Sequence, residues 1–150
     1  MALRHSLLAS TFAAAAGFSL ERPLDERLDV AVMRVAAEAA EVADAGLRLD
    51  LADVAVPQAT ADGLLRIVGE AVANAVRHAD AQMIRVELAK DGRGLRLRVA
   101  DDGKGFEPAE AGPNSASGLG VMHDEALALG AELRIVSSPG AGCEIEVVLP

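Results

Sequence analysis

The most informative stretch of this sequence is Glu70-Ala71-Val72-Ala73-Asn74-Ala75-Val76-Arg77-His78-Ala79. Apolar residues recur at helical spacing through it, so residues 60–79 are predicted to form an amphipathic helix. At about 100° per residue, Glu70, Asn74 and Arg77 fall on one stripe of that helix. A carboxylate, an amide oxygen and a guanidinium on one stripe can orient a water, ligate a hard cation and hold an anion. The alternative is that the stripe faces solvent, as the polar side of any amphipathic helix does.

A second informative segment is Asp101-Asp102-Gly103-Lys104-Gly105-Phe106, which follows a predicted strand. Glycines there permit positive φ and a close approach of a ligand to the backbone. An acidic side chain at the end of a strand can accept a hydrogen bond from an amino group such as that of adenine. The carbonyl of guanine at that position would instead meet the carboxylate as acceptor against acceptor. The alternative is an ordinary Asp-Gly turn.

A third segment, Gly118-Leu119-Gly120, opens a helix that is predicted over residues 119–129. Backbone N–H groups at a helix start and the helix dipole both favour an anion such as phosphate. The alternative is a hinge between this helix and the preceding loop, which is rich in Gly, Pro, Asn, Ser and Ala and is expected to be mobile. The glycines match neither a Walker A loop nor a Rossmann fingerprint, because no Gly-Lys-Ser/Thr follows and no βαβ unit surrounds them.

The rest of the chain is predicted to contain further helices and strands. Apolar residues at helical spacing predict helices over residues 3–16 and 25–43. Period-two alternation predicts five strands, over residues 47–51, 84–88, 95–99, 133–137 and 144–149. A hairpin is predicted where the second and third strands are joined, at Asp91-Gly92-Arg93-Gly94. The sum is an α+β domain with one sheet and helices on one face.

Composition excludes several classes of function. The chain has 150 residues, of which 51% are hydrophobic and 25% charged, as in one ordinary globular domain. Its net charge is −9 and it has no Trp or Tyr, so no nucleic acid partner is expected. A single cysteine, Cys143, excludes an intramolecular disulfide and a cysteine metal cage, which fits a reducing compartment.

The N-terminus allows two interpretations. Residues 7–16 follow Arg4 and His5 and imitate a short secretory signal. The alternative is an Ala-rich amphipathic helix, because Ala is the strongest helix former. No stretch of the sequence reaches the roughly 20 apolar residues that span a bilayer.

Together, and in this order, the three segments resemble the ATP-binding domain of sensor histidine kinases. The resemblance covers residues 60–150. Residues 70–79 are similar to the family's N box, residues 101–106 to its G1 box and residues 117–122 to its G2 box. Residues 129–133, together with 138–142, are similar to its closing helix-to-hairpin segment. Arg77-His78-Ala79 and the brevity of the domain resemble the subfamily of kinases that is paired with helix-turn-helix response regulators.

The resemblance implies the Bergerat fold of gyrase, MutL and heat-shock chaperone ATPases. This fold is a two-layer α/β sandwich in which helices back a mixed sheet and ATP lies between a helix and a mobile lid. By position, Glu70 would be the catalytic carboxylate and Asn74 the ligand of Mg²⁺. Asp101 would accept the adenine amino group, and Arg77 and His78 would approach the phosphates. The glycines of the two boxes would shape the pocket and let the lid close: Gly103, Gly105, Gly118 and Gly120.

The resemblance also implies a function and a domain organisation. Residues 46–150 would be the catalytic domain, which binds ATP with Mg²⁺ and supplies the γ-phosphoryl group for histidine autophosphorylation in two-component signal transduction. Residues 1–45 would be an N-terminal helical segment, the remnant of a dimerisation helix. The implied partners are a histidine-containing dimerisation domain and a response regulator, in a homodimeric protein at the cytoplasmic side of a sensor. The alternatives are an anti-sigma-factor-type serine kinase, an ATP-binding regulator without catalysis, and a helical interaction module that binds no nucleotide.

The sequence departs from the family pattern in three places. Cys143 stands where the family usually has Thr, so a hydroxyl contact near adenine is expected to be weakened. Met122-His123-Asp124-Glu125 replaces Met-Arg-Glu-Arg, which removes two positive charges and is expected to lower triphosphate affinity or to shift their role to Lys104 and Arg77. An acceptor histidine is not evident, since His5 is followed by Ser6 and His123 lies beside the G2 glycines. The domain is therefore expected to be inactive without a separate acceptor domain.

Overall fold

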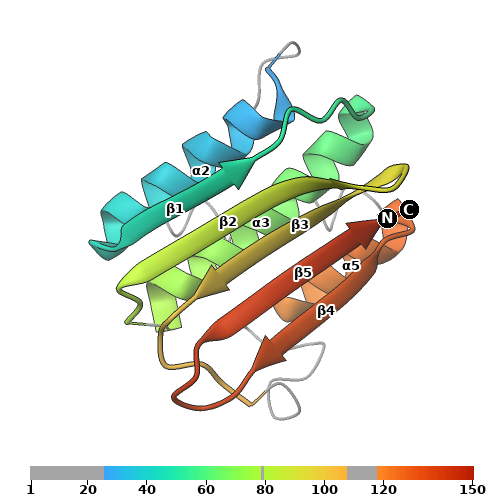
Figure 1. Cartoon of the computed structure of the whole chain (residues 1–150). Coiled ribbons are helices and arrows are strands. Elements are labelled where there is room, and N and C mark those ends of the chain that lie inside the picture. Colours follow the sequence, from blue (N-terminus) through green and yellow to red (C-terminus); the bar gives the residue numbers. More distant parts are fainter. Residues whose placement is uncertain (1–25, 79, 108–117) are drawn as a thin grey trace.

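The computed structural model describes residues 26–78, 80–107 and 118–150 (Figure 1). Among these residues, three helices cover one face of a five-stranded sheet (Figure 1). In chain order the elements are α2 (Leu28–Ala43), β1 (Gly46–Leu51), α3 (Gln58–His78), β2 (Met83–Asp91), β3 (Gly94–Asp101), α5 (Leu119–Leu129), β4 (Glu132–Ser137) and β5 (Cys143–Leu149). The predicted α+β fold with a mixed sheet backed by helices is confirmed.

The sheet has the strand order β1-β2-β3-β5-β4. The edge strand β1 runs parallel to β2, and all other neighbours are antiparallel. The predicted hairpin joins β2 to β3, with Asp91 opposite Gly94 and Gly92 at a φ of +61° in the turn. Period-two alternation places all five predicted strands within three residues of the observed bounds; the largest difference is at the end of β2, which extends to Asp91.

The hydrophobic core lies between the sheet and the helices. Successive side chains of a strand point to opposite faces, so β3 buries Leu95, Leu97 and Val99 and turns the residues between them to the other face. The two neighbouring strands contribute Val86 and Ile145, which lie opposite Val99. With only three Phe in the sequence, this core is built almost entirely of aliphatic side chains.

Helix α2 shares this core with α3. Its apolar stripe is buried, with Leu28, Val32, Val35 and Ala39 in the same cluster as the apolar residues of α3. Asp44 ends α2 in the left-handed region, and its N–H donates to carbonyl groups of the last turn. The described part of the predicted N-terminal segment therefore packs on the rest of the fold. The division at residue 45 stays a prediction, and the helix predicted over residues 3–16 lies outside the described residues.

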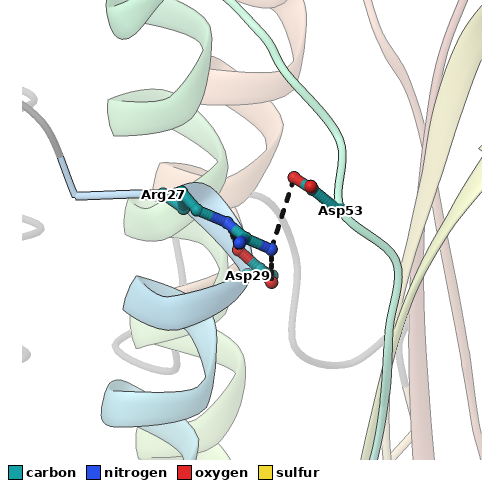
Figure 2. Close-up of polar contacts among 3 residues, drawn as sticks. All are labelled: Arg27, Asp29 and Asp53. Carbon is teal, nitrogen blue, oxygen red and sulfur yellow. Dashed lines mark hydrogen bonds and ion pairs between the residues drawn. The ribbon is translucent and has the colours of Figure 1, made fainter.

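The start of α2 is tied to the chain between β1 and α3. The Arg27 guanidinium lies between Asp29 and Asp53, with nitrogen–oxygen distances of 2.7 and 3.4 Å (Figure 2). Both carboxylates raise the pKa of Arg27, Asp29 most strongly. Because Arg27 and Asp53 are exposed, these ion pairs contribute little to stability.

None of the helices in the described ranges combines the length and the apolar character that a membrane span requires.

Candidate functional site

The polar stripe of α3 is buried rather than solvated. Glu70 has no exposed surface and Asn74 is 8% exposed. The alternative of a solvent-facing stripe is therefore wrong for these two residues. The backbones of Arg77 and His78 lie in the last turn of α3, but their side chains lie outside the described part of the structure.

The start of α5 covers Glu70. Gly118 has a φ of +81°, and a Cβ added there would overlap Oε2 of Glu70. The positive φ favours glycine at residue 118, and a Cβ there would also require the Glu70 carboxylate to move. The carbonyl of Gly118 accepts the N–H of Met122 at 3.1 Å, and Gly120 lies half-buried in the first turn of α5. The structure therefore brings the G2 segment onto the polar stripe of α3.

A second link between these helices lies further along α5. Arg66 Nε and a terminal guanidinium nitrogen donate to the two carboxylate oxygens of Glu125, at 2.8 and 3.3 Å. The Glu125 side chain is only 8% exposed. Glu125 thus faces α3 about two helical turns from the start of α5. Arg66 neutralises its negative charge, and the expected loss of two positive charges beside the phosphates stays a prediction.

Asp101 lies at the end of β3 on the helix-covered side of the sheet. It is paired with Ile84 of β2 and Cys143 of β5, so the three side chains share one face. Its Oδ1 accepts the N–H of Gly103 at 2.9 Å. Burial raises the pKa of the Asp101 carboxyl; the bond from Gly103 lowers it, and the Asp102 charge raises it further. A half-buried acceptor at a strand end is the arrangement that the sequence predicted for recognition of an amino group.

Asp102, the next residue, has a different environment. Its Oδ1 accepts the N–H groups of Gln82 and Met83 at 2.8 and 2.9 Å, and its side chain is exposed. These bonds, chiefly the one from Met83, lower the pKa of the Asp102 carboxyl. Asp102 thereby joins the end of β3 to the start of β2, the strand that follows α3.

The glycine-rich segment after β3 is fastened to the turn between β4 and β5. The N–H of Phe106 donates to Ser137 Oγ at 2.9 Å, and that hydroxyl donates to the carbonyl of Gly142 at 2.8 Å. The N–H of Gly140 donates to the carbonyl of Lys104 at 2.5 Å. A Cβ at Gly105, where φ is +64°, would overlap the carbonyl oxygen of Ser138. Sequence reasoning missed Ser137, and its only signal was its position just before the Ser-Pro-Gly turn.

Cys143 lies beside Asp101, where the resemblance expects a threonine hydroxyl. Burial, the largest cause, and the Asp101 charge raise the pKa of the Cys143 thiol to about 11, while a hydrogen bond with Ser137 acts in the opposite direction. The thiol is therefore neutral at physiological pH. Lys104, named as a substitute for the missing positive charges, pairs with Asp80 at 3.0 Å on the exposed surface.

These parts meet at one end of the molecule. The C-terminal end of α3, the end of β3 and the start of α5 lie at the same end of the sheet, on its helix-covered side (Figure 1). The short connection from α3 to β2 brings Met83 within a hydrogen bond of Asp102. The arrangement combines a buried amide and carboxylate, a helix N-terminus and a half-buried acceptor, which are groups suited to a metal-bound polyphosphate and an amino-bearing base. Within the described residues, no group of three or more His, Cys, Asp or Glu side chains is placed so that it could hold a metal ion.

Comparison with known proteins shows the family to which the chain belongs. Residues 59–150 match the family model described as histidine kinase-, DNA gyrase B- and HSP90-like ATPase. The sensor protein VraS of Staphylococcus haemolyticus is 42% identical over 101 residues, which cover 67% of this chain and 29% of that protein. VraS of Staphylococcus aureus is 41% identical over the same length. The chain thus spans under a third of these curated relatives.

Solved structures share the fold over nearly the whole chain. The histidine kinase domain of the blue-light activated kinase EL346 from Erythrobacter litoralis has a TM-score of 0.75 at 23% identity, covering 100% of this chain and 75% of that one. The histidine kinase AdeS of Acinetobacter baumannii has a TM-score of 0.68 at 15% identity, with 96% and 74% covered. At these identities the likeness establishes the fold, and the predicted resemblance is confirmed by the family match.

Proposed function

Because the chain belongs to the family of histidine kinase-, DNA gyrase B- and HSP90-like ATPases, we propose that it binds ATP with Mg²⁺ and supplies the γ-phosphoryl group to a histidine. The acceptor would lie on a dimerisation domain of a homodimeric sensor kinase, and a response regulator would take the phosphoryl group next. The similar VraS proteins are sensor proteins, which supports the assignment to a two-component system at the cytoplasmic side of a sensor.

The base end of the nucleotide site is assigned to the ends of β3 and β5. The half-buried carboxylate of Asp101 accepts the adenine amino group, since its burial and its bond to the Gly103 N–H keep it in place. Gly105 allows the backbone to pass close to the β4–β5 turn, which shapes the wall of the pocket. Cys143 occupies the neighbouring position with a neutral thiol and leaves the base without a hydroxyl contact there.

The phosphate end is assigned to α3 and α5. Gly118 and Gly120 present backbone N–H groups at the start of α5, where the helix dipole favours anions. Arg77 and His78 follow Asn74 by one turn of α3 and add positive charge or donors to the same end. The lid that these glycines are predicted to serve, residues 108–117, lies outside the described residues.

The donor set fits Mg²⁺. Asn74 offers a nearly buried amide oxygen on the same face of α3 as the Glu70 carboxylate, and hard oxygens are the ligands that Mg²⁺ takes. Asn74 is therefore proposed as the protein ligand. When bound, Mg²⁺ neutralises negative charge on the phosphates.

Phosphoryl transfer then depends mainly on position. The acceptor imidazole nitrogen forms a bond to the γ-phosphorus, the bond from that phosphorus to the β–γ bridging oxygen breaks, and ADP leaves. Glu70, which has no exposed surface in the described structure, is proposed as the carboxylate that orients and polarises the acceptor. The protein contributes alignment and a charge-complementary site, and it forms no covalent bond with the phosphoryl group.

The buried pair of Glu70 and Asn74 carries the proposal, and Asn74→Ala tests it. Calorimetric titration is expected to show Mg²⁺-dependent ATP binding for the native chain and its loss in Asn74→Ala, with an unchanged melting temperature. Gln58→Ala, which removes an exposed amide from the start of the same helix, is the control and should bind as the native chain does. Equal ATP affinity of both variants would refute the metal assignment.

The acceptor chemistry is tested with labelled ATP and a supplied dimerisation domain. Glu70→Gln is expected to bind ATP but to transfer little label. A labelled product that is lost in acid is phosphohistidine. An acid-stable product would support the serine kinase alternative, and ATP binding with no product on any acceptor would support a regulator without catalysis.

A further inference from the structure

Helices α3 and α5 are joined by three contacts that repeat along both helices. A Cβ at Gly63 would lie 3.0 Å from Leu129 Cδ2, Arg66 pairs with Glu125, and Gly118 lies against Glu70. Along α3 these residues advance by three and then four positions, and their partners on α5 run in the opposite order. The contacts therefore form a ladder between antiparallel helices, along the same stripe that continues to Asn74.

The middle contact differs from the other two because it is ionic and directional. Two parallel N–H···O bonds, at 2.8 and 3.3 Å, hold the planar guanidinium of Arg66 to the carboxylate of Glu125. The carboxylate is nearly buried, and the guanidinium is about one quarter exposed. A desolvated pair of this kind contributes little net stability compared with apolar packing, but it disfavours any arrangement that separates the two charges.

The remaining buried residues of α5 are apolar. Leu119, Met122 and Ala126 face the core, and aliphatic surfaces of this kind tolerate small shifts of one helix along another. A slide of α5 by the rise of one residue moves each side chain by about 1.5 Å along the axis and keeps the apolar side facing the core. Such a shift would carry Glu125 away from Arg66 and Gly118 away from Glu70 together.

We propose that Arg66 and Glu125 are a positioning pair that sets the register of α5 on α3 and so places the start of α5 at the phosphate end of the site. The idea rests on the proposed ATP-binding function, and it extends that function to how the site is assembled. Glu125 is one of the positions at which this sequence departs from the Met-Arg-Glu-Arg pattern of the family that it resembles.

The test uses the full chain and compares two ligands. Glu125→Gln keeps the shape of the side chain and removes its charge. It is expected to weaken binding of Mg²⁺·ATP by about tenfold, because the coupling acts on the phosphate end, while adenosine affinity changes less than about twofold. The double variant Arg66→Glu/Glu125→Arg is expected to restore most of the ATP affinity, because it rebuilds the pair with reversed charge.

The matched control is Asp124→Asn, which removes one negative charge from the exposed side of the same helix. It should leave the ratio of ATP to adenosine affinity unchanged. If Glu125→Gln lowers the melting temperature but leaves that ratio unchanged, the pair is merely structural and the positioning role is refuted. Failure of the double variant to recover affinity would also count against it.

A second measurement does not depend on nucleotide. Hydrogen exchange at the Met122 amide, which donates to the Gly118 carbonyl, reports on the first turn of α5. Glu125→Gln should speed exchange there by about tenfold and leave the amides of β3 unchanged. If the native chain binds no ATP, the proposed function fails, whereas the register assignment is still decided by this exchange rate.

Discussion

Charged and polar side chains lie on both sides of the central sheet, but they are partly exposed on one side and buried on the other. On the sheet face that α2, α3 and α5 leave uncovered, Arg98 of β3 lies 3.2, 2.9 and 3.7 Å from carboxylates of Glu87, Glu144 and Glu146. These groups are partly exposed, and the ion pairs raise the pKa of Arg98, chiefly through Glu144. On the helix-covered face, by contrast, the buried polar and charged residues within the described ranges are Glu70, Asn74 and Glu125.

The comparison shows on which side of the sheet a charged side chain depends on specific neighbours. Ion pairs on the open face interact through water and are screened by salt, so each contributes little and can be replaced. A charged group on the covered face is costly to bury, so it must be positioned by specific neighbours. Gly118 against Glu70 and Arg66 against Glu125 are such neighbours. The proposed site accordingly belongs to the covered face.

Neighbouring residues on one strand give the largest test of this contrast. Leu97→Ala is expected to lower the free energy of unfolding by about 2–5 kcal/mol, because it leaves a cavity under the helices. Arg98→Ala, one residue along on the open face, should cost about 1 kcal/mol or less. Urea denaturation of both variants measures the two free energies of unfolding, and equal losses would contradict the contrast between the two faces.

Two glycines with nearly the same backbone conformation test the close packing of the covered side. Gly118 and Gly140 have φ values of +81° and +82°, but only Gly118 has a neighbour where a Cβ would go. Gly118→Ala should therefore cost roughly 2–4 kcal/mol, from backbone strain and displacement of Glu70. Gly140→Ala should cost about 1 kcal/mol from the backbone alone. Thermal unfolding measures the loss of stability in each variant, and similar losses would argue against the contact with Glu70.

The adjacent carboxyls of Asp101 and Asp102 predict opposite dependences on pH. The raised pKa of Asp101 means that its ionisation costs stability, and this cost is relieved as the pH falls through the folded-state pKa. The lowered pKa of Asp102 means that its charge stabilises the fold above the ordinary value of 3.8, and this is lost as the pH falls through the folded-state pKa.

At pH 7, Asp101→Asn should therefore melt at or above the native temperature, and Asp102→Asn below it, each by about 2 °C or less. Both differences should shrink in acid. In the same samples Asp101→Asn should lose about tenfold or more in ATP affinity, since a bond to a charged acceptor is removed. Melting curves between pH 3 and 7 check the signs, and two shifts of the same sign would contradict the assignment.

The smallest effect is expected at Cys143. Cys143→Thr should change stability by less than about 1 kcal/mol and should raise ATP affinity by about threefold, because it supplies one neutral hydrogen bond beside Asp101. Calorimetric titration measures the gain. Cys143→Ser is the companion variant, and a gain with Ser but none with Thr would indicate that the methyl group of Thr does not fit.

The local sequence pattern was sufficient to predict the helices and strands, but not to predict the contacts between them. Alternation and helical spacing depend only on which face of an element is buried, so the predicted strands and helices lie close to those observed. The polar stripe of α3 was visible for the same reason. The burial of that stripe could not be predicted, because α5, which covers Glu70, lies about 50 residues further along the chain.

The same limit explains what sequence reasoning missed. The pairing of Arg66 with Glu125 and the bridge from Ser137 to Phe106 join residues that are 59 and 31 positions apart. Arg66 and Ser137 belong to none of the segments that resemble the family, and a lone Arg or Ser on an element usually meets solvent. The order of the three glycine- and Asn-containing segments was therefore informative, whereas the residues that hold them together became apparent only in three dimensions.

The position of β5 has a consequence for how the molecule is made. It is the last of the five strands along the chain, yet it lies inside the sheet, between β3 and β4. On a ribosome, β3 therefore keeps one row of backbone groups without partners until residues 143–149 emerge, and Asp101 gains its neighbour Cys143 only then. Nascent chains stopped before residue 143 should remain sensitive to protease and unable to retain nucleotide, so the capacity to bind is acquired only once β5 has been made.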